Sequence, residues 1–155
     1  MVILGRLLRP DVTGIAKIEA SRHPLFAPIG TLLDVAYVER GNREQTRVAL
    51  QPVIQRLADG ISVVIAPEGT RSATPRLGAF RKGAFHIAMQ AGVPLVPIVI
   101  RNASDLMWKR SLIARPGTLR VVVLPPVPTS GWTVEGLDER IAGIRQQFLD
   151  TLAAE

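Results

Sequence analysis

The chain has 155 residues, a length typical of one globular domain, and its 47% hydrophobic and 21% charged residues exclude a disordered protein. It contains no cysteine, which excludes disulfides, thiolate zinc sites and a cysteine nucleophile. The formal net charge of +6 suits phosphate ligands or an anionic membrane surface, although an arginine-rich genome explains the excess equally well.

Strands are predicted where apolar, β-branched residues form short runs. In chain order these runs cover residues 12–17, 35–39, 62–66, 95–100 and 119–124. The run at 62–66 is of the kind found in a sheet that is covered on both faces.

Three helices are predicted between and after these strands. The first stops at Gly60, and Pro52 argues against a long helix there unless the helix starts close to the proline. The second covers about residues 82–91, with Gly92 beyond its C-terminus, and the third is capped by Thr133. The apolar sides of the first and third helices consist of Val48, Leu50, Val53, Ile54 and Leu57, and of Leu137, Ile141, Ile144, Phe148 and Leu152.

This alternation predicts an α/β fold, in which one domain over residues 1–155 has a mostly parallel central sheet with flanking helices. No apolar run approaches the roughly 20 residues that a membrane-spanning helix needs. No small-residue cleavage site follows the apolar start, so we expect a soluble or peripheral protein without an export signal. The start itself, at residues 1–8, looks like the second half of a helix.

The loop after the third predicted strand carries the most informative residues. Ligands of open α/β sheets bind beyond the carboxyl ends of strands, and here a strand is followed by Glu68, Gly69, Thr70, Arg71 and Ser72. The arginine fork and the two hydroxyls are suited to a phosphate, and the glycine lets a ligand approach the backbone closely. A carboxylate would repel a phosphate, so Glu68 is expected to pair with a cation or to accept a ligand hydroxyl. A solvated loop with an incidental ion pair fits the same spacing equally well.

Four blocks of the sequence, taken together, resemble the lysophosphatidic acid acyltransferase family. The upstream block consists of Lys17, Pro24-Leu-Phe26, Gly30 and Val38-Glu-Arg40. The other three are Pro67-Glu-Gly-Thr-Arg-Ser72, Phe80-Arg-Lys-Gly83 and Val93-Pro-Leu-Val-Pro-Ile98, in an order and at distances similar to those of the family. The block that ends at Arg40 departs most from the family pattern, because Asp34 to Val38 stands where the family has a glycine and a hydrophobic run.

The resemblance implies a glycerolipid acyltransferase of phospholipid synthesis. Such an enzyme moves an acyl chain from acyl-CoA or acyl carrier protein to a lysophospholipid, without a metal or redox cofactor, on the inner face of the cytoplasmic membrane. By this resemblance Arg71, Lys82 and Arg40 bind the acceptor phosphate, while Glu68, Gly69, Thr70 and Ser72 shape the acceptor site.

The catalytic histidine of that family is not recognisable in this sequence. Its His-x-x-x-x-Asp motif supplies the general base and the aspartate that orients it. Five residues after His23 stands Pro28, and five residues after His86 stands Ala91, so neither histidine fits the motif. The motif is expected just before Met1, which predicts that the chain lacks its N-terminal part and is nearly inert alone.

Two other functions compete with catalysis. A non-catalytic module derived from the family, which binds phospholipid or membrane, is favoured by the missing motif. Nucleic-acid binding is disfavoured, because four Phe, two Trp and one Tyr, without basic residues interleaved, offer few stacking platforms.

Overall fold

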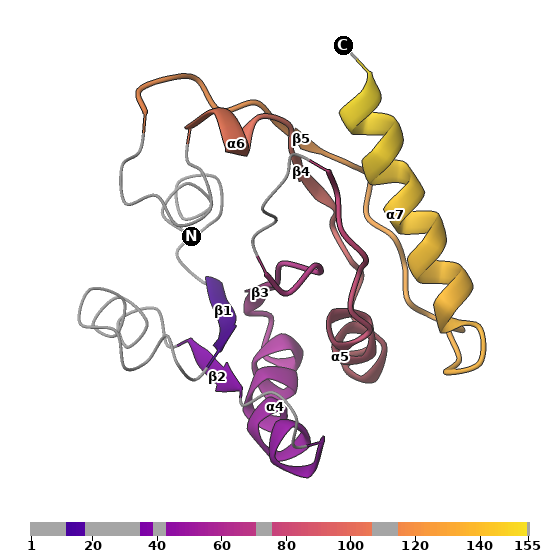
Figure 1. The fold of residues 1–155 in the computed structure, drawn as a ribbon. Coiled ribbons are helices and arrows are strands. Elements are labelled where there is room, and N and C mark those ends of the chain that lie inside the picture. The colour runs from indigo at the N-terminus through magenta and orange to yellow at the C-terminus, as the bar shows by residue number, and fades with distance from the viewer. Residues whose placement is uncertain (1–11, 18–34, 39–42, 71–75, 107–114, 155) are drawn as a thin grey trace. The chain divides into compact units, whose positions relative to one another are not determined.

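The structure is a computed structural model that describes residues 12–17, 35–38, 43–70, 76–106 and 115–154 (Figure 1). The chain divides into two compact units, one up to Ile65 and one from Ala66 onward. Each unit has its own strands and helices. That residues 1–155 make up one domain stays a prediction.

Among the residues that the structure describes, the first unit shows a three-stranded parallel sheet and one helix (Figure 1). β1 (Val12–Lys17) is the central strand, and it pairs in parallel with β2 (Ala36–Val38) and with β3 (Ser62–Val64). α4 (Arg43–Ala58) connects β2 to β3 and contacts both strands. Two parallel strands at opposite edges need such a crossover connection. The predicted α/β fold with a parallel sheet is thereby confirmed.

α4 corrects two details of the prediction. Pro52 lies inside this helix of 16 residues, so the expectation that it would prevent a long helix is wrong. Packing offsets the hydrogen bond that Pro52 cannot donate, because Val53 is only 1% exposed and the helix lies on the sheet. Val48 is 61% exposed and does not belong to the buried side. At about 100° per residue, it lies on the opposite side of the helix from Val53.

In its described residues, the second unit shows three helices and a pair of antiparallel strands. Its elements are α5 (Gly83–Ala91), β4 (Ile98–Ile100), α6 (Ala103–Leu106), β5 (Val121–Val123) and α7 (Leu137–Ala153). α5 ends as predicted, because Gly92 has a left-handed φ of 65° and its N–H reaches the carbonyls of Ala88 and Met89.

β4 and β5 pair antiparallel, with Val99 opposite Val122. The sheet of the second unit is therefore not parallel, unlike that of the first. Asn102 closes the end of this ladder, since its side chain donates to the carbonyl of Thr118 at 2.9 Å and accepts from the N–H of Arg120 at 2.8 Å. This side-chain clamp joins the residues that follow β4 to those that precede β5.

The core of the second unit lies against α7. Leu137 is fully buried, and it forms a cluster with Phe85, Ile141 and Ile144. The predicted apolar side of this helix is confirmed, because Phe148 and Leu152 are also half-buried. The predicted cap is wrong. α7 begins at Leu137, and the hydroxyl of Thr133 instead accepts the N–H of Gly136 at 3.3 Å, one residue before the helix.

Candidate functional site

The predicted acceptor loop starts with a tight turn after β3. The N–H of Gly69 donates to the carbonyl of Ala66 at 3.0 Å, which reverses the chain direction around Glu68. Gly69 has a φ of 67°, a conformation that costs a residue with a Cβ atom energy but costs glycine little. The glycine of the Glu-Gly-Thr-Arg block therefore has a conformational role within the turn.

Two hydrogen bonds close this loop on itself. The carboxylate Oε2 of Glu68 accepts the N–H of Gly78 at 2.8 Å, and the carbonyl of Pro67 accepts the N–H of Arg81 at 2.7 Å. The approach of Glu68 requires glycine at 78, because a Cβ added there would lie 2.9 Å from Oε2. The carboxylate was expected to pair with a cation or a ligand hydroxyl, and in the structure it stabilises the loop through a backbone amide.

α7 supports the far side of the loop through two side chains that are three residues apart on one helix face. The guanidinium of Arg145 donates from Nε to the carbonyl of Gly78 and from Nη2 to the carbonyl of Leu77, each at 2.9 Å. The ring of Phe148 meets that of Phe80 edge-on, with 5.1 Å between the ring centroids. The geometry of the loop is thus fixed by tertiary contacts as well as by its own sequence.

Lys82 stands just before α5, as predicted, but its ammonium group has a protein partner. It lies 2.7 Å from Oδ1 and 2.8 Å from Oδ2 of Asp138, in the first turn of α7. Both side chains are largely exposed, with exposed fractions of 54% and 73%. The neighbouring Arg81 is exposed as well, and the start of α5 has no side-chain cap, so its N–H groups and helix dipole favour an anion.

The structure describes four of the seven predicted site residues. Glu68 and Gly69 are half-buried in the closed loop, while Thr70 and Lys82 are exposed. The other three, Arg71, Ser72 and Arg40, lie outside the described residues, as does His23.

The sequence analysis did not assign a role to three residues that contact the loop or Lys82. They are Gly78, Arg145 and Asp138. Arg145 had a signal, because it is a charged residue four positions after Ile141 and three before Phe148, within the apolar side of α7. Gly78 and Asp138 had none, since their roles depend on contacts between distant parts of the chain.

Residues 1–101 match the family model described as Acyltransferase. The chain belongs to the acyltransferase family. The resemblance seen in the four sequence blocks is thereby confirmed. α7 and the two side chains with which it holds the loop lie outside the matched residues of this acyltransferase.

Curated relatives carry the same name in several organisms. The 1-acyl-sn-glycerol-3-phosphate acyltransferases of Limnanthes alba, Cocos nucifera and Saccharomyces cerevisiae are 31%, 34% and 31% identical to this acyltransferase chain. The similarity covers 91%, 94% and 97% of this chain and 50%, 48% and 50% of the relatives. The chain therefore spans about half the length of the curated relatives that it matches.

A solved structure is similar over nearly all of this chain. It is the 1-acyl-sn-glycerophosphate (LPA) acyltransferase PlsC from Thermotoga maritima, with a TM-score of 0.73 and 26% sequence identity. The match covers 94% of this chain and 58% of that chain. The acyltransferase fold predicted from the sequence is thereby confirmed.

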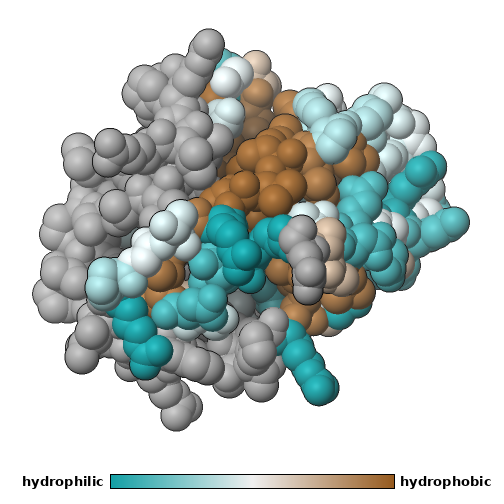
Figure 2. Space-filling view, turned by 90° about the horizontal axis from the view of Figure 1, so that it is seen from above, coloured by the Kyte–Doolittle hydropathy of each residue, from teal (hydrophilic) through white to brown (hydrophobic). Residues whose placement is uncertain are grey.

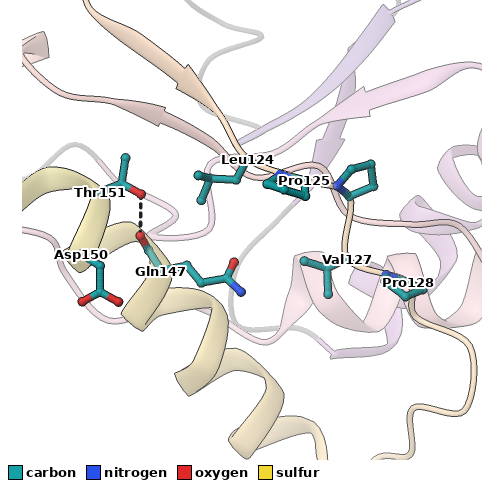
Figure 3. Close-up of a pocket in the computed structure, with 8 residues that line it drawn as sticks. Leu124, Pro125, Val127, Pro128, Gln147, Asp150 and Thr151 are labelled. Carbon is teal, nitrogen blue, oxygen red and sulfur yellow. Dashed lines mark hydrogen bonds between the residues drawn. The ribbon is translucent and has the colours of Figure 1, made fainter. Parts of the chain in front are cut away.

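A separate groove of about 470 Å³ runs between α7 and the extended segment at 124–128 (Figure 3). Leu124 and Val127 lie on one side of it, and Gln147 and Thr151 of the acyltransferase's last helix lie on the other. The hydroxyl of Thr151 donates to the carbonyl of Gln147 at 2.7 Å, so it is engaged within the helix. None of the predicted site residues that the structure describes lines this groove.

The described residues contain no group of three or more histidine, aspartate and glutamate side chains that could hold a metal ion. His86 is half-buried in α5. Within the described part of the chain, no helix is both long and apolar enough to cross a membrane.

Proposed function

We propose that this acyltransferase moves an acyl chain from a thioester of coenzyme A or acyl carrier protein to lysophosphatidic acid, yielding phosphatidic acid. The observation that carries the proposal is the hydrogen bond in which Glu68 accepts the N–H of Gly78, because this bond fixes the first residue of the Glu-Gly-Thr-Arg block. The names of the relatives give the acceptor class.

In this proposal the acceptor phosphate is bound by Arg71, Lys82 and Arg40. Thr70 and Ser72 add hydroxyl donors, and the start of α5 adds its dipole. The exposure of Thr70 and Lys82 supports these roles, since a ligand can reach both side chains from solvent. Glu68 and Gly69 shape the turn after β3, so the acceptor loses less binding energy to ordering this part of the site.

The reaction is an acyl transfer without a metal or redox cofactor. The free hydroxyl oxygen of the acceptor attacks the thioester carbonyl carbon, the new ester C–O bond forms, and the C–S bond breaks. A general base takes the hydroxyl proton, which ends on the leaving thiolate. No histidine of this sequence has an aspartate five residues after it, and removing a general base costs about two to four orders of magnitude in rate. We therefore expect the 155-residue chain to be nearly inert by itself.

Association with the cytoplasmic membrane surface accompanies this function, because the lipid substrates lie there. The net charge of +6 favours an anionic bilayer. Figure 2 shows a continuous hydrophobic area on the face seen from above, and a patch of this kind is typical of a contact site. Among the described residues of the second unit, Val96, Val123 and Val134 are large hydrophobic residues with exposed fractions of 49%, 61% and 59%.

The test separates binding from turnover. Binding of 1-hexanoyl lysophosphatidic acid is measured by calorimetry for the chain and for Arg71→Ala, and thiol release is measured with an acyl-CoA. We expect binding that Arg71→Ala weakens at least about tenfold, as for the loss of a charged hydrogen-bonding partner, with almost no thiol release. Equal binding by Arg71→Ala would contradict the proposed acceptor site. Rapid turnover that survives His23→Ala and His86→Ala would contradict the expected inertness.

A non-catalytic phospholipid-binding module is the second candidate, and the absence of the histidine motif from this sequence favours it. Intact mass and N-terminal peptide mapping of the native protein from its own cells separate the two. A native protein that contains His-x-x-x-x-Asp supports the enzyme. A native protein that begins at Met1 supports the binding module.

A further inference from the structure

We infer that Arg145 is a positioning residue for acceptor binding: it holds the backbone at 77–78 so that Gly78 keeps its hydrogen bond to Glu68 of the acceptor site. This inference rests on the proposed function. Arg145 lies in α7, beyond the residues 1–101 that match the family model, and it is not among the residues that the sequence resemblance singled out.

Arg145 binds two consecutive backbone carbonyls at once. Nε and Nη2 of Arg145 each donate to a different carbonyl, those of Gly78 and Leu77, at 2.9 Å in part-buried surroundings. A planar guanidinium that bridges two consecutive carbonyls fixes both the position and the orientation of that backbone segment. A single donor cannot fix both.

Gly78 links this backbone segment to the acceptor block. The N–H of Gly78 donates to Oε2 of Glu68 at 2.8 Å, so the same residue receives a bond from Arg145 and gives one to Glu68. The hydrogen bonds run from the guanidinium through the Gly78 backbone to the carboxylate. Hydrogen bonds in such a chain polarise and reinforce one another. Without Arg145, the loop samples shapes in which this amide and the carboxylate are apart.

α7 is itself held in place by the core of the second unit and by the loop. Ile141 and Ile144 of α7 are buried in the core of the second unit, and Phe148 packs against Phe80 at the end of the loop. Arg145 therefore projects from a rigid element, as a residue that positions a site must do. Loss of its two hydrogen bonds lowers the fraction of molecules with a competent loop, and the apparent affinity falls by the same factor.

The test compares Arg145→Ala and Arg145→Lys with Arg140→Ala in the full chain. Arg140 is an exposed residue of the same helix, so its variant removes the same charge without touching the loop. Two quantities are measured on each: the exchange rate of the Gly78 amide by NMR on glycine-labelled protein, and the dissociation constant for 1-hexanoyl lysophosphatidic acid. Thermal unfolding checks that each variant folds. If Arg145→Ala does not fold, the same two measurements on Arg145→Lys test the inference.

For Arg145→Ala we expect both the amide exchange rate and the dissociation constant to rise about tenfold. Arg145→Lys should recover part of both losses, since lysine can reach one carbonyl but not bridge two, and Arg140→Ala should change each by less than about twofold. If Arg145→Ala is folded and the exchange rate of its Gly78 amide is unchanged, the inference is overturned. Faster exchange of the Gly78 amide with an unchanged dissociation constant also overturns it. The same holds if Arg140→Ala weakens binding as much as Arg145→Ala does.

The proposed function fails in a different way from this inference. If Arg71→Ala abolishes binding and Arg145→Ala does not weaken it, the inference is wrong and the acceptor site stands. If the unmodified chain does not bind the lysophospholipid at all, the acceptor site itself is wrong.

Discussion

Asp138 holds the ammonium group of Lys82 at 2.7 Å and 2.8 Å through its two carboxylate oxygens. The pair joins the residue before α5 to the first turn of α7, across 56 positions of the sequence. Lys82 is also the lysine that we propose as a phosphate ligand. Its carboxylate partner and an acceptor phosphate therefore compete for one cation.

Asp138→Asn should release Lys82 and strengthen the binding of lysophosphatidic acid about two- to fivefold. The effect on the free energy of unfolding should stay below about 1 kcal/mol, because the pair is exposed and screened. Glu139→Gln is the matched control, since it removes the same charge from the same helix turn. Calorimetry at two salt concentrations measures the difference. An equal increase in affinity for lysophosphatidic acid in both variants would mean that Lys82 has no specific role in phosphate binding.

Gly78→Ala should damage the site through a steric clash. The added Cβ would lie 2.9 Å from Oε2 of Glu68, so the carboxylate must move away from the amide of residue 78. We expect about tenfold weaker acceptor binding and a loss of about 1 kcal/mol in stability. Gly143→Ala, where nothing lies within 4 Å of an added Cβ in α7, should instead stabilise by about 0.5–1 kcal/mol. Urea unfolding and calorimetry measure both variants, and unaltered binding by Gly78→Ala would contradict the role of Glu68.

Leu137→Ala should be among the most destabilising single substitutions in the second unit. Leu137 is fully buried at the centre of the cluster with Phe85, Ile141 and Ile144. Truncation leaves a cavity, which typically costs about 2–5 kcal/mol. Val134→Ala, at a position that is 59% exposed, should cost little. Urea unfolding followed by circular dichroism measures the difference, and similar midpoints for the two variants would contradict this core.

Pro52→Ala should stabilise α4. The substitution restores an N–H that can donate to the carbonyl of Val48, and it removes the ring that crowds the preceding turn. A more flexible unfolded chain offsets part of the gain, which leaves about 1–2 kcal/mol. Gln51→Ala, at the exposed neighbouring position, is the control for helix propensity. A loss of stability in Pro52→Ala, measured by thermal unfolding, would mean that the fold depends on the proline.

Local patterns in the sequence predicted most of the secondary structure. β1 has the predicted limits, and α5 ends where Gly92 forces it to. β4 and β5 are shorter than their apolar runs, because a strand ends where its pairing ends and apolar residues continue beyond that point. The antiparallel direction of β5 could not be predicted, since a strand's own composition does not encode the direction of its partner.

The candidate site was predicted only in part, for the same physical reason. The Glu-Gly-Thr-Arg block was visible because its residue types suit phosphate. The framework around it depends on contacts over long sequence separations, such as Arg145 with Gly78. No periodicity reports such a contact, and only the position of Arg145 within an apolar helix side hinted at it.

The support of the loop by α7 has a consequence for dissecting this chain. A protein cut after residue 101 would retain every residue that matches the family model. It would lose Arg145 and Phe148, the two side chains that hold the loop from outside, and the leucine and isoleucines that cover Phe85. Such a shortened protein would keep the recognisable motif while releasing the backbone that gives the motif its shape, and it would present Phe85 to water.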